Sequence, residues 1–562
     1  MTPTNPIAIN SMMKTTTLLA LTLLLITPLL PGCSTTNIPS TPSIKPRLAA
    51  TPPMGWNSWE AFRREFTEDS IKEQADAMVS TGLRDAGYTY LVIDGGWKPG
   101  TRGPNNLLIE DPAKFPHGMK ALADYVHSKG LKFGLHQPAG IHDCPKLSPG
   151  SQGFEEADAA LFIKWGVDFI KYDRCDYVHA KDTTSGAPDI DRIVLRQGTT
   201  ELFSTEAEAV QNHLTGLARV EPRDTCSGGH CVTAIGYDNG ALTIPDISVP
   251  ADGKYSLDLY LSFPYFGMER YNTVTLFVTA NGSSPHRIQL PYDMAQRYTL
   301  HKTTLELTLK KGSNSITLNN PHSQEDEIRH SYLKMAHALE KSDHPIMFSV
   351  CTVPRPWLWC QPIAHLFRCE TDVNDHWTGN NGAILPILDR HIPLLTYTSP
   401  EFWPDPDMLE VGHKDPVGRP NASNPSMTHN EYQAQFSLWA IMNAPLFISM
   451  DLRHLDDSTK SLLLNKDVIA INQDPLASPC RCIRSAGDIQ IFAKSLADGS
   501  TAVAFLNRSP KPATVQIPFS ELGIQSPHPT SKDLWTGQTI PLSSPLLQTS
   551  VPTHAVVLLR IK

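Results

Sequence analysis

The sequence predicts an α/β fold, namely a (β/α)8 barrel with an inserted β-sandwich and a C-terminal antiparallel β-sandwich. Three observations predict it. From Pro53 onward, short apolar strands alternate with amphipathic helices, as in a parallel sheet closed into a barrel. Between about Asp182 and Arg329, apolar residues recur with period two and no helical pattern intervenes. Short alternating strands return from about Cys480 to Lys562.

The barrel segments are apolar strands, several of which end in a carboxylate. We expect strands at Thr89–Asp94, Phe133–Gln137, Phe169–Asp173, Ile346–Cys351, Leu394–Ser399 and Leu446–Asp451. The periodicity predicts helices at Ser70–Ala86, Met119–Lys129, Phe154–Trp165 and Tyr332–Glu340. Active sites of such barrels lie at the C-terminal ends of the strands, so Asp94, Asp173 and Asp451 are candidates for the site.

The inserted β-sandwich follows the fourth barrel strand. Its expected strands are Lys254–Phe263, Thr275–Ala280, His286–Leu290 and a hairpin over Thr304–Asn320. Because the insert leaves the barrel just after Asp173, we expect it at the active-site end. The aromatic residues Tyr260, Phe263, Tyr265 and Phe266 suit core packing better than a sugar-binding platform.

The domain boundaries follow from these patterns. The barrel is predicted at 50–182 and 331–478, the insert at 183–330, and the C-terminal β-sandwich at 479–562. In the last of these we expect strands at Ile489–Lys494, Thr501–Asn507 and Ala555–Ile561.

The N-terminus has the pattern of an export signal. Lys14 precedes an apolar run from Leu18 to Leu30, and Leu30-Pro31-Gly32-Cys33 resembles a bacterial lipobox. We predict a lipoprotein signal peptide at 1–32, a lipid anchor on Cys33 and a Ser/Thr/Pro-rich tether at 33–49. The prediction is a lipoprotein of the periplasm, outer membrane or cell surface whose only membrane contact is the anchor. Plain secretion is the alternative.

Net charge and cysteine content indicate which partners and which covalent cross-links to expect. A net charge of −9 argues against nucleic acid as a partner, because phosphates favour basic surfaces. Ten cysteines in an exported chain predict disulfides. Without Cys33 nine remain, so at least one lacks an intramolecular partner. Cys226 and Cys231 are close enough to pair, whereas Cys480 and Cys482 would form a strained bridge.

Three short segments carry the candidate chemistry. In a strand, Lys171 and Asp173 point to the same side, and the nearby ammonium lowers the pKa of the carboxylate. That suits a nucleophile that must be ionised. The other two segments are Arg368–Val373 and Trp403–Leu409. Sequence spacing alone does not select which carboxylates work as a pair.

The chain resembles glycoside hydrolase family 27, the family of α-galactosidases and α-N-acetylgalactosaminidases. The resemblance covers nearly all of 53–562 except the insert. It rests on Met54-Gly55-Trp56-Asn57-Ser58-Trp59, Ile93-Asp94, Trp165-Gly166-Val167-Asp168, Lys171-Tyr172-Asp173-x-Cys175, Arg368-x3-Asp372, Asp405-Pro406-Asp407-Met408-Leu409 and Asn472-Gln473-Asp474-Pro475-Leu476.

The resemblance implies a retaining, exo-acting α-glycosidase with two catalytic carboxylates and no cofactor for catalysis. Asp173 matches the nucleophile and Asp372 the general acid/base. The sugar-binding positions match Trp59, Asp94, Lys171, Arg368 and Asp407. Cys144 and Cys175 match a disulfide beside the nucleophile. The implied partner is a galactose-containing or related oligo- or polysaccharide.

Several recognition positions depart from the family pattern. Gly95 stands where the family has a second Asp, and Gly96 replaces a common Cys. His136 stands in place of a Tyr, and Thr352 begins the replacement of a Glu-Trp pair, so His136 and Thr352 are substrate-binding candidates. Such changes alter sugar discrimination. The same mechanism on a β-L-arabinopyranoside, an isomaltose unit of dextran or an α-N-acetylgalactosaminide therefore stays open. A non-catalytic glycan-binding lipoprotein is an alternative of another class, which the two retained carboxylates argue against.

The insert resembles a carbohydrate-binding module of the family 35 or family 6 type. Glu206-Ala207-Glu208-Ala209 matches the first strand of such modules, where acidic side chains hold a structural calcium. Glu206 and Glu208 are therefore calcium-ligand candidates, because calcium prefers carboxylate oxygens. The alternative is an exposed acidic strand edge.

Overall fold

The computed structural model describes residues 47–265, 271–413, 426–526, 529–542 and 545–562. The predicted signal peptide, the lipid-anchor residue Cys33, most of the tether and Phe266 lie outside these residues. Within them, no helix combines the length and apolar character needed to cross a bilayer.

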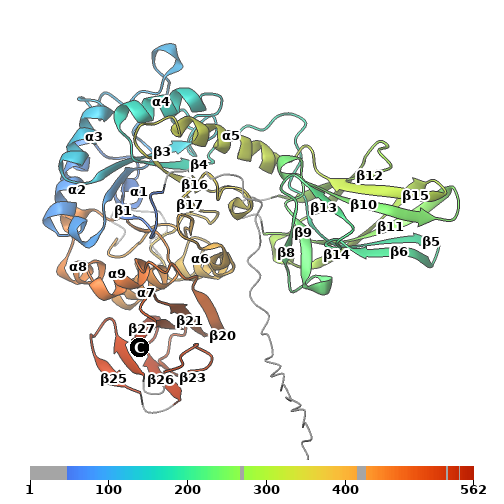
Figure 1. Ribbon diagram of the computed structural model, residues 1–562. Coiled ribbons are helices and arrows are strands. Elements are labelled where there is room, and N and C mark those ends of the chain that lie inside the picture. The colour runs from blue at the N-terminus through green and yellow to red at the C-terminus, as the bar shows by residue number, and fades with distance from the viewer. Residues whose placement is uncertain (1–46, 266–270, 414–425, 527–528, 543–544) are drawn as a thin grey trace, which may run out of the picture. The chain divides into compact units, whose positions relative to one another are not determined.

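Eight parallel strands form the barrel (Figure 1). Their order is β18-β17-β16-β4-β3-β2-β1-β19, and the contact between Leu409 and Ile448 brings the two edges together. The Leu409 N–H donates to the Phe447 carbonyl at 2.7 Å. This confirms the predicted fold class. The strands are β1 (Met54–Asn57), β2 (Tyr90–Ile93), β3 (Lys132–Pro138), β4 (Phe169–Asp173), β16 (Met347–Cys351), β17 (Leu366–Phe367), β18 (Trp403–Pro404) and β19 (Leu446–Ile448).

Helices follow the strands and bury an apolar face against them. Asn57 ends β1, and its side chain caps the next helix by accepting from the Trp59 N–H at 2.8 Å. The turn from strand to helix thus brings Trp59 to the end of the first strand. The helices are α1 (Ser58–Phe62), α2 (Glu68–Ser80), α3 (Met119–Ser128), α4 (Glu155–Trp165), α5 (Gln324–Leu339), α6 (Ile384–His391), α7 (His429–Ile441), α8 (Asp457–Leu463) and α9 (Lys466–Asn472).

One predicted barrel strand is wrong. The segment expected as the strand Leu394–Ser399 is largely a 3-10 helix, Ile392–Tyr397. Pro393 lies in its first turn, where the missing N–H costs nothing and the fixed φ favours a helix. The strand at this place in the barrel is β18 instead, and the two-residue β17 was not predicted because so short a strand has no measurable period.

Asp451 is also not a strand end. Strand β19 stops at Ile448, and the Asp451 side chain caps a short helix by accepting from the Arg453 N–H at 3.1 Å. It also accepts from the Gln74 amide at 2.8 Å. Asp451 therefore holds a loop to α2 and has a structural role.

The insert consists of two antiparallel sheets around a separate apolar core (Figure 1). Their orders are β13-β12-β15-β10-β7 and β14-β11-β5-β9-β8, with β6 beside β5. The strands are β5 (Asp189–Gln197), β6 (Thr200–Glu206), β7 (His213–Thr215), β8 (Arg219–Pro222), β9 (His230–Thr233), β10 (Ala241–Val249), β11 (Gly253–Ser262), β12 (Thr273–Ala280), β13 (His286–Pro291), β14 (Leu300–Leu309) and β15 (Gly312–Asn319).

The two ends of the insert, where it joins the barrel, contact each other directly. Thr184 pairs with Ser323, and the Gln324 N–H donates to the Thr184 carbonyl at 2.9 Å. Helix α5 begins directly there, eight residues before the predicted Tyr332. The boundary predicted at residue 330 consequently falls inside α5.

The insert packs against the loops that follow the barrel strands β16 and β17. The Arg219 guanidinium donates to the Leu358 carbonyl at 2.7 Å, and the Tyr265 hydroxyl reaches Glu370 at 2.9 Å. These loops extend from the C-terminal ends of their strands, so the expected location of the insert is confirmed. Phe263 and Tyr265 are buried, as core packing predicts.

The C-terminal strands form a six-stranded antiparallel sheet faced by a two-stranded one. The Trp535 indole N–H donates to the Ser437 hydroxyl of α7 at 2.9 Å, which ties this sandwich to the barrel. The strands are β20 (Arg481–Ala486), β21 (Ile489–Ser495), β22 (Thr501–Asn507), β23 (Ala513–Pro518), β24 (Thr530–Asp533), β25 (Thr539–Pro541), β26 (Leu546–Val551) and β27 (Ala555–Ile561).

A buried ion-pair cluster fastens the insert to the barrel, and its loss is testable. Arg355, in the loop after β16, lies 2.8 Å from Glu325 and 3.3 Å from Asp189, and its side chain is 2% exposed. Arg355→Ala leaves two buried carboxylates short of a partner, so we expect a loss of about 3–5 kcal/mol in the free energy of unfolding.

Urea unfolding followed by tryptophan fluorescence measures this loss. The matched control is Lys254→Ala, which removes an exposed ion pair with Glu306 on the same insert and should leave the unfolding midpoint unchanged. Equal midpoints for the wild type and Arg355→Ala would contradict the structural role of the cluster.

Candidate active site

The candidate site residues come together because each lies at or just after the end of a barrel strand. In a parallel barrel all these ends meet at one face. Trp59 follows β1, Asp94 follows β2, His136 lies in β3, Lys171 and Asp173 in β4, Thr352 follows β16, Arg368 follows β17 and Asp407 follows β18. The predicted positions therefore converge from seven strands.

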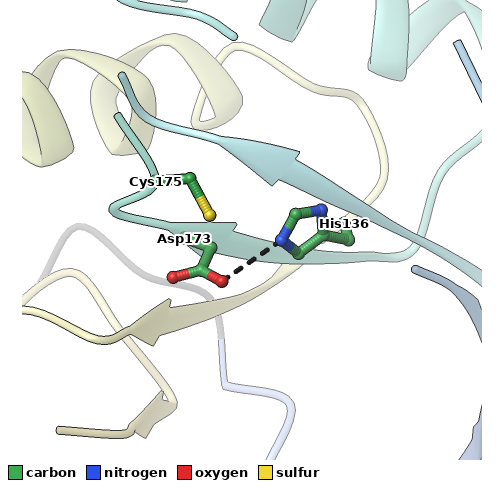
Figure 2. Close-up of side chains that lie close together, drawn as sticks. All are labelled: His136, Asp173 and Cys175. Carbon is green, nitrogen blue, oxygen red and sulfur yellow. Dashed lines mark hydrogen bonds and ion pairs between the residues drawn. The ribbon is translucent and has the colours of Figure 1, made fainter. Parts of the chain in front are cut away.

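Asp173 is held from both sides by hydrogen-bonding side chains, and Figure 2 shows the contact with His136. Its Oδ2 lies 3.3 Å from the His136 Nε2, and its Oδ1 accepts a hydrogen bond from the Thr352 hydroxyl. Burial alone would raise the pKa of Asp173. The His136 hydrogen bond and the charges of His136, Lys171 and Arg368 outweigh it and hold the pKa well below the usual range. Asp173 is therefore ionised at neutral pH.

Backbone strain accompanies this arrangement. Thr352 has φ of 55° and Asp407 has φ of 81°, in a region that a β-branched residue such as Thr rarely adopts. The Thr352 N–H donates to the Arg368 carbonyl at 2.8 Å, which helps to hold the strained backbone. Such strain concentrates at functional sites, where the surrounding structure compensates for it.

Asp94 and Lys171 form a buried ion pair next to Asp173. The Lys171 Nζ lies 2.9 Å from the Asp94 Oδ2, which also accepts from the Asn57 amide at 3.1 Å. Burial opposes the charge on Asp94, but Lys171 and His136 lower its pKa below the usual range. The pair thus places a carboxylate and an ammonium, both charged, beside the Asp173 carboxylate.

Arg368 links two further carboxylates. Its guanidinium pairs with Asp372 and lies 3.2 Å from Asp407, while its side chain is only 2% exposed. Asp407 also accepts from the Val373 N–H at 2.9 Å. The Asp372 side chain is 63% exposed. The site therefore holds a mostly covered, ionised carboxylate in Asp173 and a solvent-facing one in Asp372, near the same arginine.

Trp59 forms one wall beside a gap. A Cβ at Gly95 would lie 3.6 Å from the Trp59 ring and 3.8 Å from the Arg64 guanidinium, so the site has room for a Cβ atom at this position. A small cavity of about 30 Å³ lies deeper in the barrel against Asn57, Lys171 and Asp407. A larger one, about 290 Å³, lies between α5, β16 and His365 and contains none of the candidate residues.

Two residues of the site were not assigned from the sequence. Asn57 orients Asp94, and its position at the end of β1 is the signal that could have identified it. Asp405 accepts from the Asp407 N–H at 2.8 Å. Burial and the Asp407 carboxylate raise the pKa of Asp405 to about 6. The local sequence gives no signal for the raised pKa of Asp405, because burial and the neighbouring carboxylate are decided by the tertiary structure.

The disulfide predicted between Cys144 and Cys175 is present, two residues beyond Asp173. In the part of the chain that the structure describes, Cys226 and Cys231 are both free thiols, so their local pairing is not formed. The strained bridge between Cys480 and Cys482 is also absent from this part of the chain, because both are free.

In two places among the described residues, side chains of the types that bind metal ions lie close together. One contains Cys175, whose sulfur is already in the disulfide. The other is Glu60, Glu410 and His413. Burial and the Glu60 carboxylate raise the pKa of Glu410 well above the usual range. In the absence of a cation, the Glu410 carboxyl is therefore held in its neutral form.

The calcium candidates of the insert lie beside a third carboxylate. The Ser227 hydroxyl is 2.5 Å from Glu206 and 2.9 Å from Asp191. Burial and the Glu206 carboxylate raise the pKa of both Asp191 and Glu208. The Glu208 Oε2 is buried without a hydrogen-bond partner. Glu206 and Asp191 thus share the Ser227 hydroxyl, and Glu208 lies near enough to Glu206 for their charges to interact.

Comparison with known proteins gives matches along most of the chain. The family described as alpha galactosidase A matches residues 51–231 and 309–474, and the alpha galactosidase C-terminal beta sandwich domain matches 486–561. The alpha-galactosidase of Cyamopsis tetragonoloba is 29% identical over 90% of this chain and 85% of its own length. Alpha-galactosidase A of Cellvibrio japonicus is 29% identical over 92% and 93%.

A solved structure agrees with these matches at the level of the fold. Alpha-galactosidase I of Mortierella vinacea superposes with a TM-score of 0.62, covering 92% of this chain and 97% of that one at 23% identity.

Removing the charge of Lys171 should destabilise the protein in a pH-dependent way. The folded pKa of Asp94 is depressed, so its contribution to stability is full above the unfolded pKa of about 4 and is lost as pH falls through the folded value. Lys171→Met removes the main cause of this depression. The stability deficit of the variant should be largest at pH 7 and shrink below about pH 4.

Urea unfolding at pH 7 and at pH 3.5 tests whether the stability deficit shrinks on acidification. Lys171→Arg is the control that keeps the charge. A deficit that grows on acidification would contradict the assigned role of the ion pair.

Proposed function

Because the chain belongs to glycoside hydrolase family 27 and is a glycoside hydrolase, we propose that it is a retaining, exo-acting α-galactosidase. The observation that carries the mechanism is the contrast between the two carboxylates near Arg368. Only 13% of the Asp173 side chain is exposed and its pKa is lowered, whereas 63% of the Asp372 side chain is exposed. A nucleophile must be ionised, and an acid/base must exchange protons with leaving group and water.

In the first step the Asp173 carboxylate attacks the anomeric carbon of the terminal sugar. The bond from that carbon to the glycosidic oxygen breaks, and Asp372 in its acid form gives a proton to the leaving oxygen. In the second step the Asp372 carboxylate takes a proton from water. The water oxygen then bonds to the anomeric carbon and releases Asp173. Two inversions leave the product with the configuration of the substrate.

The other site residues hold the sugar. Asp94, Lys171, Arg368 and Asp407 present charged groups that hydrogen-bond hydroxyls, while the half-buried Trp59 offers an aromatic face to the apolar C–H side of the ring. Without substrate these charges pair with one another, as in Lys171 with Asp94. The charges are therefore already oriented, which lowers the cost of reorganisation on binding.

His136 and Thr352 contact the proposed nucleophile directly. We infer that they orient Asp173 and contact the sugar from opposite sides. These two departures, together with the gap at Gly95, are the specific observations that favour a second candidate: the same mechanism on another sugar, such as a β-L-arabinopyranoside, an isomaltose unit or an α-N-acetylgalactosaminide. The relatives named as α-galactosidases favour galactose.

Hydrolysis of nitrophenyl α-galactoside by residues 34–562 tests the function. We expect release by the wild type and a loss on the order of 10³-fold or more in kcat for Asp173→Asn, which keeps the shape but removes the nucleophilic charge. NMR during the reaction should show the α-anomer of the sugar first, as retention requires.

The outcomes separate the alternatives. If only a different nitrophenyl glycoside is cleaved, the proposed mechanism stands and the specificity is for that other sugar. Initial release of the β-anomer would exclude a retaining mechanism, and no hydrolysis of any glycoside would favour a binding protein.

We also propose that Glu206, Glu208 and Asp191 bind a structural calcium ion in the insert. Because the ion binds only the folded state, 1 mM calcium should raise the Tm of EDTA-treated protein by about 3 °C or more. Glu208→Gln should abolish the shift, while Glu306→Gln, an exposed change on the same insert, should preserve it. An unchanged Tm on adding calcium to the wild type would rule the site out.

A further inference from the structure

Glu370 is a buried carboxylate two residues before the proposed acid/base Asp372. Its side chain is 0% exposed. Both carboxylate oxygens accept from the Tyr265 hydroxyl, at 2.9 and 3.0 Å, and Oε2 lies 2.5 Å from the Arg390 Nε. Arg390 belongs to α6 of the barrel, but Tyr265 belongs to the insert, three residues beyond β11. The insert therefore contributes a direct hydrogen bond to the segment that carries Asp372.

The ring of Tyr265 is held in place by a stack of aromatic residues. It lies nearly parallel to Trp357, at an interplanar angle of 8° and 6.5 Å between centroids. Trp357 in turn stacks on Tyr397 at 5.8 Å. Trp357 lies in the loop after β16, and only 5% of Tyr265 is exposed. Because the ring is clamped, the position of its hydroxyl is set by the docked insert.

Asp372 itself has little to hold it. Its side chain is 63% exposed, and the contact described for it is the ion pair with Arg368. The chain on either side is anchored instead. Glu370 is anchored by Tyr265 and Arg390, and the Val373 N–H by Asp407 at 2.9 Å. The location of the Asp372 carboxylate thus depends on the backbone between these two anchors.

We propose that Tyr265 of the insert is a positioning residue for Asp372, acting through its hydrogen bonds to Glu370. On this proposal, which rests on the proposed function, the insert completes the active site and is more than an attached module. The Tyr265 hydroxyl holds the Glu370 carboxylate, Glu370 holds the backbone, and the backbone sets the distance from Asp372 to the glycosidic oxygen. A small misplacement of a catalytic group slows the step that it assists.

The proposal predicts a dependence on the leaving group. Proton donation matters for a poor leaving group such as methanol and hardly for dinitrophenolate, which leaves without a proton. Tyr265→Phe keeps the ring in its stack and removes only the hydroxyl. We expect kcat/KM to fall about tenfold for methyl α-galactoside and less than twofold for dinitrophenyl α-galactoside, and Glu370→Gln to show the same pattern.

Two control variants isolate the contact. Tyr397→Phe removes another hydroxyl between the barrel and the insert, bonded to Glu221 at 3.1 Å, and Tyr255→Phe removes one within the insert, bonded to the Ala251 carbonyl at 2.7 Å. Both should keep the wild-type ratio of the two kcat/KM values. This ratio does not depend on the fraction of protein that is folded, so a poorly folding variant is still informative.

The proposal is overturned if Tyr265→Phe has the same ratio of the two kcat/KM values as the wild type. It is also overturned if Tyr397→Phe changes this ratio as much as Tyr265→Phe does. The proposed function is tested separately, by whether the wild type cleaves α-galactosides at all. If it cleaves another glycoside, the same ratio is measured there. Hydrogen exchange needs no substrate: amides of 370–374 should exchange faster in Tyr265→Phe than in Tyr255→Phe, and equal rates would also overturn the proposal.

Discussion

Arg368, whose guanidinium is buried, connects the ends of three barrel strands through its side chain and its backbone carbonyl. Its side chain pairs with Asp372 and Asp407, its carbonyl accepts from the Thr352 N–H, and its charge helps to keep Asp173 ionised. A guanidinium with only 2% of its side chain exposed is stable only when carboxylates surround it. The need to neutralise this charge therefore draws the loops after β17 and β18 together, and the backbone hydrogen bond from Thr352 to Arg368 adds the loop after β16.

The two proposed catalytic carboxylates lie in different surroundings. Asp173 lies among His136, Lys171 and Arg368, whose combined effect exceeds the cost of burial. Asp372 extends toward solvent from the same arginine. Two chemically identical side chains thus differ in exposure and in the charged groups around them, as the two roles in double displacement require. The unusual φ values of Thr352 and Asp407 show that the backbone is strained to produce this arrangement.

The insert joins this system from outside the barrel. Arg355 pairs with Asp189 and Glu325 and fastens the insert to the loop after β16, while Tyr265 contacts Glu370 near Asp372. The barrel accommodates an insertion after β4 because loops at strand ends tolerate added chain. The contacts of the insert with two neighbouring loops nevertheless place it among the parts of the molecule that shape the site.

The amino-acid sequence was sufficient for the barrel, the insertion point and the convergence of Asp94, Lys171 and Asp173, because period and strand ends are local properties. The motif Arg368-x3-Asp372 was equally visible. Sequence patterns failed where long-range packing decides: the 3-10 helix at Ile392–Tyr397, the two-residue strand β17 and the removal of Asp451 from the site. Only the tertiary structure could decide the raised pKa of Asp405 and the contact of Tyr265 with Glu370. Both depend on burial and on residues that are distant in sequence.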